Sequence, residues 1–406
     1  FSYSVPTIAM TNVQGAGGTA AFPERKWAAV FGNGYNSTYG FATLFVNFIE
    51  DANDGSWDAG DFVKIRTGFG PAPVGEPNPG LPNGLGEPRL IDLDGNGTVD
   101  YAYAGDMRGN LFRFDMTSPN PANWTSTRIF RATYSDGTPQ PITTQPIVTR
   151  NTQADGVVVL IGTGSYFTTT DGTDESIQSI YGIWDRVRAN PFTAEANPPT
   201  AAGDRSLLVE QEIINLFDET EGALRSLTAN EVRYAIGSVT PPEPAVRGWY
   251  IDLDPPRPTV TVQGGINPDQ AGDPPPGPQF PGERAVRNLD LRGGFLFVNT
   301  VIPRDNLSCD VSPGGFGLAI NPLTGGAGGL NAANAFDINN DGRFDSGDLV
   351  GGNIIAGLRF DEAVPTDSTF IGTRRFTQLS DRTLDIRDTN TGFGPRTGRL
   401  SWRELE

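Results

Sequence analysis

The sequence has 406 residues, a formal net charge of −18 and no histidine. An acidic chain without a basic stripe cannot neutralise a phosphate backbone, so nucleic acid is excluded as a partner. The missing histidine excludes Ser-His-Asp and Cys-His triads and histidine-based zinc sites. Hydrophobic residues make up 37% of the chain, and no apolar run is long enough to predict a transmembrane segment.

Short β-type runs follow one another along the chain, separated by clusters of Gly, Asn, Asp and Pro. The predicted strands cover residues 27–31, 42–49, 62–65, 101–105, 111–115, 157–162, 181–184, 233–236, 248–253, 294–302 and 317–320. Residues 207–217 have the best helical pattern, although the same residues could form a strand. Strands about ten residues apart with turn signals between them predict an all-β sandwich, barrel or propeller.

Three related phrases favour the propeller among these all-β folds. Each contains a strand, a glycine-containing turn and an aromatic residue, and they lie at residues 30–35, 104–114 and 160–167. Glycine and aromatic phrases that recur in this way are typical of repeated blades. Residues 71–88 and 255–281 are dense in Pro and Gly, and we predict that they are surface loops inserted between strands.

The segment from Asp92 to Asp100 has the spacing of a calcium-binding loop. Oxygen-bearing residues alternate along it, with a backbone carbonyl expected from position 7; the candidate ligands are Asp92, Asp94, Asn96, Thr98 and Asp100. Calcium takes six to eight oxygen ligands, and Gly97 at position 6 permits the sharp turn. Position 12 is Tyr103, so we expect the loop without the acidic residue of a helix–loop–helix hand. The alternative is an Asp- and Asn-rich turn without metal.

A second loop has the fuller pattern. Its candidate ligands occupy positions 1, 3, 5, 7, 9 and 12, and they are Asp337, Asn339, Asp341, Arg343, Asp345 and Asp348. Gly342 stands at position 6, and the alternative is again an ordinary turn. Residues 50–61 resemble this loop but carry Ala52 at position 3, so we expect a turn that does not bind an ion. Neither full loop has an obvious catalytic companion, which favours structural or regulatory binding over an enzyme.

Several phrases resemble the C-terminal domain of the PilY-type family of type IV pilus biogenesis and tip-adhesin proteins. The most specific is LIDLDGNGTVDYAYAGDMRGNLFRFD at residues 90–115. The others, in chain order, are WAAVFGNGYNS at residues 27–37, IGTGSYF at 161–167, SIYGIWD at 179–185, RGWYIDL at 247–253, GERAV at 282–286 and GRLSWREL at 398–405. The resemblance runs from about residue 20 to the end of the chain.

The resemblance implies a modified seven-bladed β-propeller, similar in shape to quinoprotein dehydrogenases, as a single domain over residues 1–406. It also implies Ca²⁺ at the Asp92 loop, a second calcium site at the Asp337 loop, and control of pilus extension against retraction. The expected partners are minor pilins at the pilus tip and, in some members, a host or abiotic surface. The expected location is extracytoplasmic, at the bacterial cell surface, pilus tip or outer membrane.

Two features depart from the family pattern. No Arg-Gly-Asp triplet occurs, so integrin-type adhesion is not supported, and the family's N-terminal von Willebrand-like region is absent from this sequence. We therefore expect a C-terminal part of a longer protein that is not an enzyme. The alternatives are a quinoprotein-like dehydrogenase, with Trp184, Trp249 and Trp402 as candidate cofactor contacts, and a calcium-dependent surface lectin.

Overall fold

The computed structural model describes residues 4–18, 23–35, 37, 40–51, 56, 58–70, 83–218, 222–234, 246–253, 280–303, 314–330, 332–361 and 363–392. Most of the two stretches rich in Pro and Gly, the segment 398–405 and Trp402 lie outside these residues. No helix in the described residues is long and apolar enough to cross a membrane.

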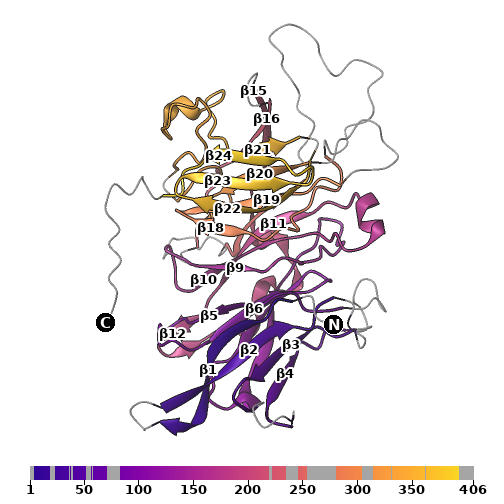
Figure 1. The fold of residues 1–406 in the computed structure, drawn as a ribbon, viewed down its shortest axis with the longest axis vertical. Helices are drawn as coiled ribbons and strands as arrows, with labels where there is room; N and C mark the ends of the chain where they lie inside the picture. Colours follow the sequence, from indigo (N-terminus) through magenta and orange to yellow (C-terminus); the bar gives the residue numbers. More distant parts are fainter. Residues whose placement is uncertain are drawn as a thin grey trace.

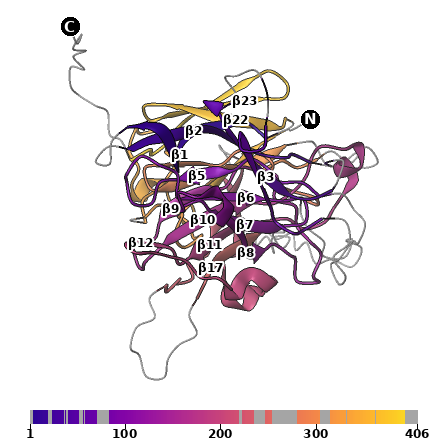
Figure 2. The same ribbon diagram turned by 90° about the horizontal axis from the view of Figure 1, so that it is seen from below.

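Residues 7–131 form two four-stranded antiparallel sheets in simple chain order. Sheet 1 contains β1 (Thr7–Gly18), β2 (Pro23–Gly32), β3 (Thr43–Phe48) and β4 (Phe62–Arg66). Sheet 2 contains β5 (Arg89–Ile91), β6 (Tyr101–Gly105), β7 (Asn110–Asp115) and β8 (Thr125–Arg131). Figure 2 shows β5, β6, β7 and β8 side by side in this order.

Three further sheets follow, and two of them recruit strands from later in the chain. Sheet 3 has the order β14 (Val209–Glu210), β17 (Gly248–Asp252), β11 (Ser179–Asp185), β10 (Val157–Gly162) and β9 (Ile147–Arg150). Sheet 4 has the order β15 (Ile213–Asp218), β16 (Gly222–Leu227), β21 (Gly357–Phe360), β20 (Gly315–Ile320), β19 (Phe295–Asn299) and β18 (Asp290–Arg292). Sheet 5 contains β22 (Pro365–Ile371), β23 (Arg374–Leu379) and β24 (Leu384–Asp388).

The remaining elements are small. A two-stranded hairpin joins β12 (Arg188–Ala189) to β13 (Phe192–Thr193). The short 3₁₀ helices are η2 (Pro121–Asn123), η3 (Thr169–Thr173), η4 (Pro199–Ala202), η5 (Arg205–Leu207) and η6 (Ser346–Asp348). The described part of the chain is therefore all-β, as predicted, while the count of seven blades stays a prediction.

Along the long axis the sheets follow one another from sheet 1 at one end, through sheets 2 and 3, to sheet 4 at the other (Figure 1). Sheet 5 lies level with sheet 4, where β22 contacts β19. The inner sheets are consequently buried on both faces, which explains the unbroken apolar run of β10. Val159 and Ile161 pack towards sheet 2, whereas Val158 and Leu160 join the cluster shared with sheet 4. Alternate residues of one strand thus serve two different cores, as the two-residue period of a strand requires.

The repeated glycine phrases also have a structural basis. Gly32, Gly105 and Gly162 each end a strand, in sheets 1, 2 and 3 respectively. A Cβ at any of the three would lie within 3.0 Å of the chain segment that enters the following sheet. The repeat therefore marks the place where the chain passes from one sheet to the next, because only glycine allows such a close approach.

Most predicted strands are confirmed, and two regions differ. Residues 207–217 form no α-helix, because the backbone of β15 pairs along its length with β16, from Ile213 opposite Leu227 to Asp218 opposite Gly222. The strand predicted at residues 233–236 is wrong for Arg233 and Tyr234, which are irregular. Tyr234 is held instead by burial of its ring and by a hydrogen bond from its hydroxyl to the Leu323 carbonyl at 2.5 Å.

Candidate functional site

The Asp92 loop connects the edge strand β5 to β6 in sheet 2. Gly95 and Gly97 adopt φ angles of 79° and 90°, in the left-handed region that favours glycine. The two turns reverse the chain within the nine residues from Asp92 to Asp100. As a result, one carboxylate oxygen from each of Asp92, Asp94 and Asp100 lies within 4.8 Å of the other two. Asp92 and Asp94 are exposed, whereas Asp100 is buried.

Backbone N–H groups hold the Asp92 carboxylate in place. Its Oδ1 accepts hydrogen bonds from Gly95 and Asn96 at 2.7 and 3.1 Å, and its Oδ2 accepts one from Gly97 at 2.7 Å. Each carboxylate oxygen has about two lone-pair directions, so these bonds use both directions on Oδ1 and leave one free on Oδ2. The arrangement fixes the carboxylate before any ligand arrives.

Asp100 closes the loop from the strand side. Its Oδ2 accepts hydrogen bonds from the Leu93 and Asp94 backbone N–H groups at 2.7 and 3.3 Å. Burial raises the pKa of the Asp100 carboxyl above its usual range, and the nearby Asp94 carboxylate adds to this effect. A cation between these carboxylates would favour the ionised form, because an opposite charge offsets both the desolvation and the repulsion.

Asn96 and Thr98 complete the predicted set. The Asn96 Oδ1 accepts the Thr98 backbone N–H at 2.8 Å, and its Nδ2 donates to Asp94 Oδ2 at 3.0 Å. The Thr98 hydroxyl donates towards Asn96 and Asn12. The Thr98 side chain is thus occupied inside the protein, which is consistent with a ligand role for its carbonyl alone.

Asn12 on β1 is a residue that the sequence pattern did not reveal. Its Nδ2 donates to the Val99 carbonyl at 2.9 Å and to the Met116 carbonyl at 3.3 Å, and its Oδ1 accepts from the Thr98 hydroxyl at 2.8 Å. A backbone hydrogen bond from Val99 to the Met10 carbonyl at 2.9 Å runs beside it. Asn12 therefore fastens the loop of sheet 2 to sheet 1.

Replacing Asn12 with alanine is expected to lower the free energy of unfolding by about 1–3 kcal/mol, because buried partners lose their hydrogen bonds. Urea unfolding of the purified chain measures this difference. Asn123→Ala is the matched control, since Asn123 is exposed and donates only one long side-chain bond, to Ser118 at 3.4 Å. Equal stability of the two variants would contradict the bracing role of Asn12.

The Asp337 loop repeats the same hydrogen-bond pattern. Asp337 accepts from the backbone N–H groups of positions 5 and 6, at 3.1 and 2.8 Å. Asp348 at position 12 accepts from positions 2 and 3, Ile338 and Asn339, at 2.8 and 3.4 Å. In the first loop the N–H groups of positions 2 and 3 donate instead to Asp100, at position 9. Asp100 therefore occupies the closing role for which the sequence offered no acidic residue at position 12.

The two loops differ in how far their acidic groups converge. Among the described residues, a cluster of three carboxylates within 4.8 Å of one another is found only in the first loop. In the second loop the Asp345 carboxylate is engaged by η6, where its Oδ1 accepts the Gly347 N–H at 2.8 Å. The bonds from the Asp341 and Arg343 N–H groups to the Asn339 and Asp341 oxygens, at 3.1 and 2.9 Å, have counterparts in the first loop and do not distinguish the two. The Asp92 loop is thus the stronger candidate metal centre.

Residues 50–61 are described only in part. Asp51 forms an ion pair with Lys26 at 2.5 Å, and Asp61 Oδ2 accepts the Asp58 N–H at 2.5 Å. Residues 52–55 and 57 lie outside the described part of the chain. The expectation of a turn that binds no ion therefore stays a prediction.

Trp184 and Trp249 pack in the core between sheets 3 and 4. They are 4% and 0% exposed, and their indole N–H groups donate to the Asp155 and Pro322 carbonyls at 2.8 and 3.2 Å. Both side chains are therefore accounted for by packing and hydrogen bonding within the protein.

These observations define an all-β protein of packed sheets in which a loop with three converging carboxylates lies where two sheets meet. The chain belongs to the PilY1 β-propeller domain family, whose model matches residues 3–220, more than half of the sequence.

Two relatives are type IV pilus proteins. The chain is 26% identical to the type IV pilus biogenesis factor PilY1 of Pseudomonas aeruginosa (strain UCBPP-PA14), over 100% of this chain and 33% of that protein. It is 28% identical to the PilY1 homolog of Xylella fastidiosa (strain Temecula1), over 94% of this chain and 25% of that protein. The chain thus spans a quarter to a third of the length of these relatives.

A solved structure supports the fold. The crystal structure of the Pseudomonas aeruginosa PilY1 C-terminal domain aligns with a TM-score of 0.67, covering 96% of this chain and 72% of that chain. The sequence identity in this comparison is 24%, so the match speaks for the architecture alone.

Proposed function

We propose that residues 1–406 form one non-enzymatic, calcium-binding propeller domain of a type IV pilus biogenesis factor. The family match and the names of the relatives support the pilus role. The expected setting is outside the cytoplasm, at the pilus tip or cell surface, with minor pilins as partners. There the domain would favour pilus extension over retraction and contribute to adhesion to a host or abiotic surface.

The observation that carries the calcium proposal is the convergence of three carboxylates in the Asp92 loop. Calcium prefers carboxylate, amide and carbonyl oxygens, and the loop offers all three kinds. Asp92, Asp94 and Asp100 would supply carboxylates, Asn96 an amide oxygen and Thr98 its carbonyl. The surroundings of the buried Asp100 raise its pKa, so a divalent cation nearby would favour its ionised form.

The position of the loop suggests how an ion would act. The loop is bound to sheet 1 through Asn12 and through the backbone of Met10, so an ion that fixes the loop also fixes the junction of sheets 1 and 2. A ligand that binds only the folded form stabilises it by about 2.7 kcal/mol at a hundredfold excess over its Kd. Calcium would thereby set the rigidity of a surface that pilus components contact.

The test is made in the parent protein, in its bacterial host. We expect Asp92→Asn to reduce surface piliation and twitching motility in medium with calcium, with the protein still present in normal amount. Asp136→Ala is the matched control, because Asp136 also caps an exposed turn, through the Thr138 N–H at 2.8 Å, but lies outside both loops. Wild-type piliation in the Asp92→Asn strain would refute the proposed role of the loop.

The second loop is proposed as a further calcium site of lower affinity, with Asp337, Asn339, Asp341, the Arg343 carbonyl, Asp345 and Asp348 as ligands. Its hydrogen-bond pattern matches that of the first loop, although its carboxylates converge less. Among the described residues no specific contact favours the dehydrogenase or the lectin alternative.

A further inference from the structure

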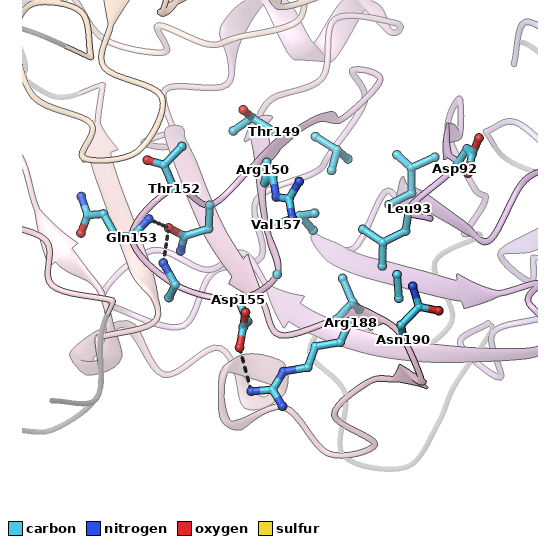
Figure 3. A pocket seen from close by; sticks show the side chains of 17 residues that line it. Asp92, Leu93, Thr149, Arg150, Thr152, Gln153, Asp155, Val157, Arg188 and Asn190 are labelled. Carbon is cyan, nitrogen blue, oxygen red and sulfur yellow. Dashed lines mark hydrogen bonds and ion pairs between the residues drawn. The ribbon is translucent and has the colours of Figure 1, made fainter. Parts of the chain in front are cut away.

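A cleft of about 1040 Å³ opens beside the Asp92 loop, between sheets 2 and 3 (Figure 3). One wall is formed by Ile91 and Leu93, where β5 runs into the loop. The opposite wall is the hairpin between β9 and β10, and the chain before and within β12 closes one side. Both β5 and β9 are edge strands of their sheets, so the cleft lies between two sheet edges.

Among the described residues, the charged side chain of Arg150 in this cleft has no ion-pair partner. Arg188 forms an ion pair with Asp155 at 2.8 Å, and the Asp92 carboxylate is held by the N–H groups of its own loop. Arg150 is exposed and lines the cleft, and its guanidinium has no hydrogen bond or ion pair with any described residue. Figure 3 shows Arg150 between Leu93 on one side and Thr152 and Gln153 on the other.

A second polar group in the cleft wall lacks a partner. Asn151 is 4% exposed, and its Oδ1 accepts the N–H groups of Gln153 and Ala154 at 2.9 and 3.2 Å. Its Nδ2 finds no acceptor among the described residues. A buried donor without an acceptor is unfavourable, so a ligand oxygen that reaches this Nδ2 would be stabilising. Because Nδ2 is shielded from solvent, such a ligand must first displace the side chains that cover it.

The rest of the lining indicates what kind of molecule carries that oxygen. The lining contains both apolar and polar side chains, and Ile91, Leu93 and Val148 are only partly buried. None of the lining residues is aromatic, whereas sugar rings are commonly bound by stacking on aromatic faces. A peptide with apolar residues beside an acidic one matches this mixture better than a glycan does.

We propose that this cleft binds an extended segment of a partner protein, with a ligand carboxylate paired to Arg150 and a ligand oxygen accepting from Asn151 Nδ2. Arg150 can hold a carboxylate with two parallel N–H···O bonds, which supplies both affinity and orientation. The site does not use the calcium ligands for this contact, so it stands whether or not the loop binds calcium.

The test uses fluorescence anisotropy of the purified chain with a set of labelled peptides. In each peptide one Glu or Asp is flanked by Val and Leu, and a paired peptide carries Gln or Asn instead. We expect wild type to prefer acidic peptides and Arg150→Gln to bind them about tenfold more weakly, with little change for the amide peptides. Arg66→Gln is the matched control, because Arg66 is an exposed arginine on β4 in another sheet.

Asn151→Asp gives a second arm, since the aspartate keeps the acceptor for Gln153 and Ala154, removes the donor and places a negative charge near the ligand carboxylate. It should also weaken acidic peptides selectively. The proposal is overturned if wild type shows no preference for acidic peptides, or if Arg150→Gln and Arg66→Gln bind them equally well. It is also overturned if the chain binds an oligogalacturonate and none of the peptides. Repeating the titrations with Asp92→Asn and with a chelator separates this site from the calcium loop, because peptide binding that depends on Arg150 should persist.

Discussion

Replacing Glu283 with glutamine is expected to lower the free energy of unfolding by about 3–5 kcal/mol, because it leaves Arg225 as a buried charge without a counter-charge. Both side chains are 0% exposed. The two guanidinium nitrogens Nη1 and Nη2 donate to the two carboxylate oxygens of Glu283, each at 2.7 Å. The pair joins β16 to the segment that enters sheet 4.

The surroundings prevent Arg225 from escaping to water after the substitution. Its guanidinium lies 3.5 Å from the centre of the Phe316 ring. The Glu283 carboxylate also accepts the Thr300 hydroxyl at 2.5 Å. A glutamine would keep one acceptor oxygen but would turn an NH₂ group towards the guanidinium, so that donor faces donor.

Unfolding in guanidinium chloride, followed by circular dichroism, measures this change in the free energy of unfolding. Glu231→Gln serves as the control, since Glu231 pairs with Arg233 on the surface, where the two side chains are 68% and 61% exposed. We expect that control to unfold like wild type, because exposed ion pairs contribute little. An unfolding midpoint of Glu283→Gln equal to that of the control would show that the buried pair does not hold sheet 4 in place.

Asp92→Asn is expected to remove most of the stabilisation that calcium gives to the purified chain, about 2.7 kcal/mol at a hundredfold excess over Kd. The amide keeps one oxygen for the loop N–H groups but turns its NH₂ towards the N–H that the other carboxylate oxygen accepted, so the calcium-free stability should also fall, by about 1 kcal/mol. The calcium response is therefore compared within each variant. The lost charge matters to the ion, because a divalent cation is bound chiefly by carboxylates. Thermal unfolding with calcium and with a chelator gives the difference directly.

The choice of Asp92 over Asp100 follows from the structure. Both carboxylates accept backbone N–H groups, but Asp100 is 0% exposed whereas Asp92 is exposed, so replacing Asp100 would weaken the fold more, with or without calcium. Asp136→Ala, outside both loops, should keep the full calcium response. Asp337→Asn reports on the second loop separately. A calcium-induced rise in melting temperature that is the same in Asp92→Asn and wild type would refute the assignment.

Much of the local structure could be predicted from the sequence because its causes are local. The glycines and alternating oxygens between Asp92 and Asp100 define a turn whose side chains converge, and the structure brings three of those carboxylates together. Many strands of sheets 1 to 3 could be predicted for the same reason, since short β-type runs are bounded by turn residues. The strands β1, β5, β8 and β9 could not be predicted in this way. Ile213–Asp218 was ambiguous, because its pairing with β16 is a tertiary choice that periodicity cannot decide.

Contacts between distant residues could not be predicted in this way. Asn12 lies 87 residues from Val99 in sequence, and nothing in the motif marks it as a brace of the loop. The sequence also could not show why the Asp92 loop has no acidic residue at position 12. Tyr103 is buried between sheets 2 and 3, where its hydroxyl donates to Asp185 at 2.8 Å, and Asp100 takes the closing role instead.

The central claim is that the Asp92 loop binds calcium. Anomalous difference density from crystals grown with calcium tests it most directly. We predict a peak enclosed by Asp92, Asp94, Asn96, Asp100 and the Thr98 carbonyl, with oxygen distances of about 2.3–2.6 Å. Density at that point explained by water alone, in crystals soaked in abundant calcium, would contradict a metal centre at this loop.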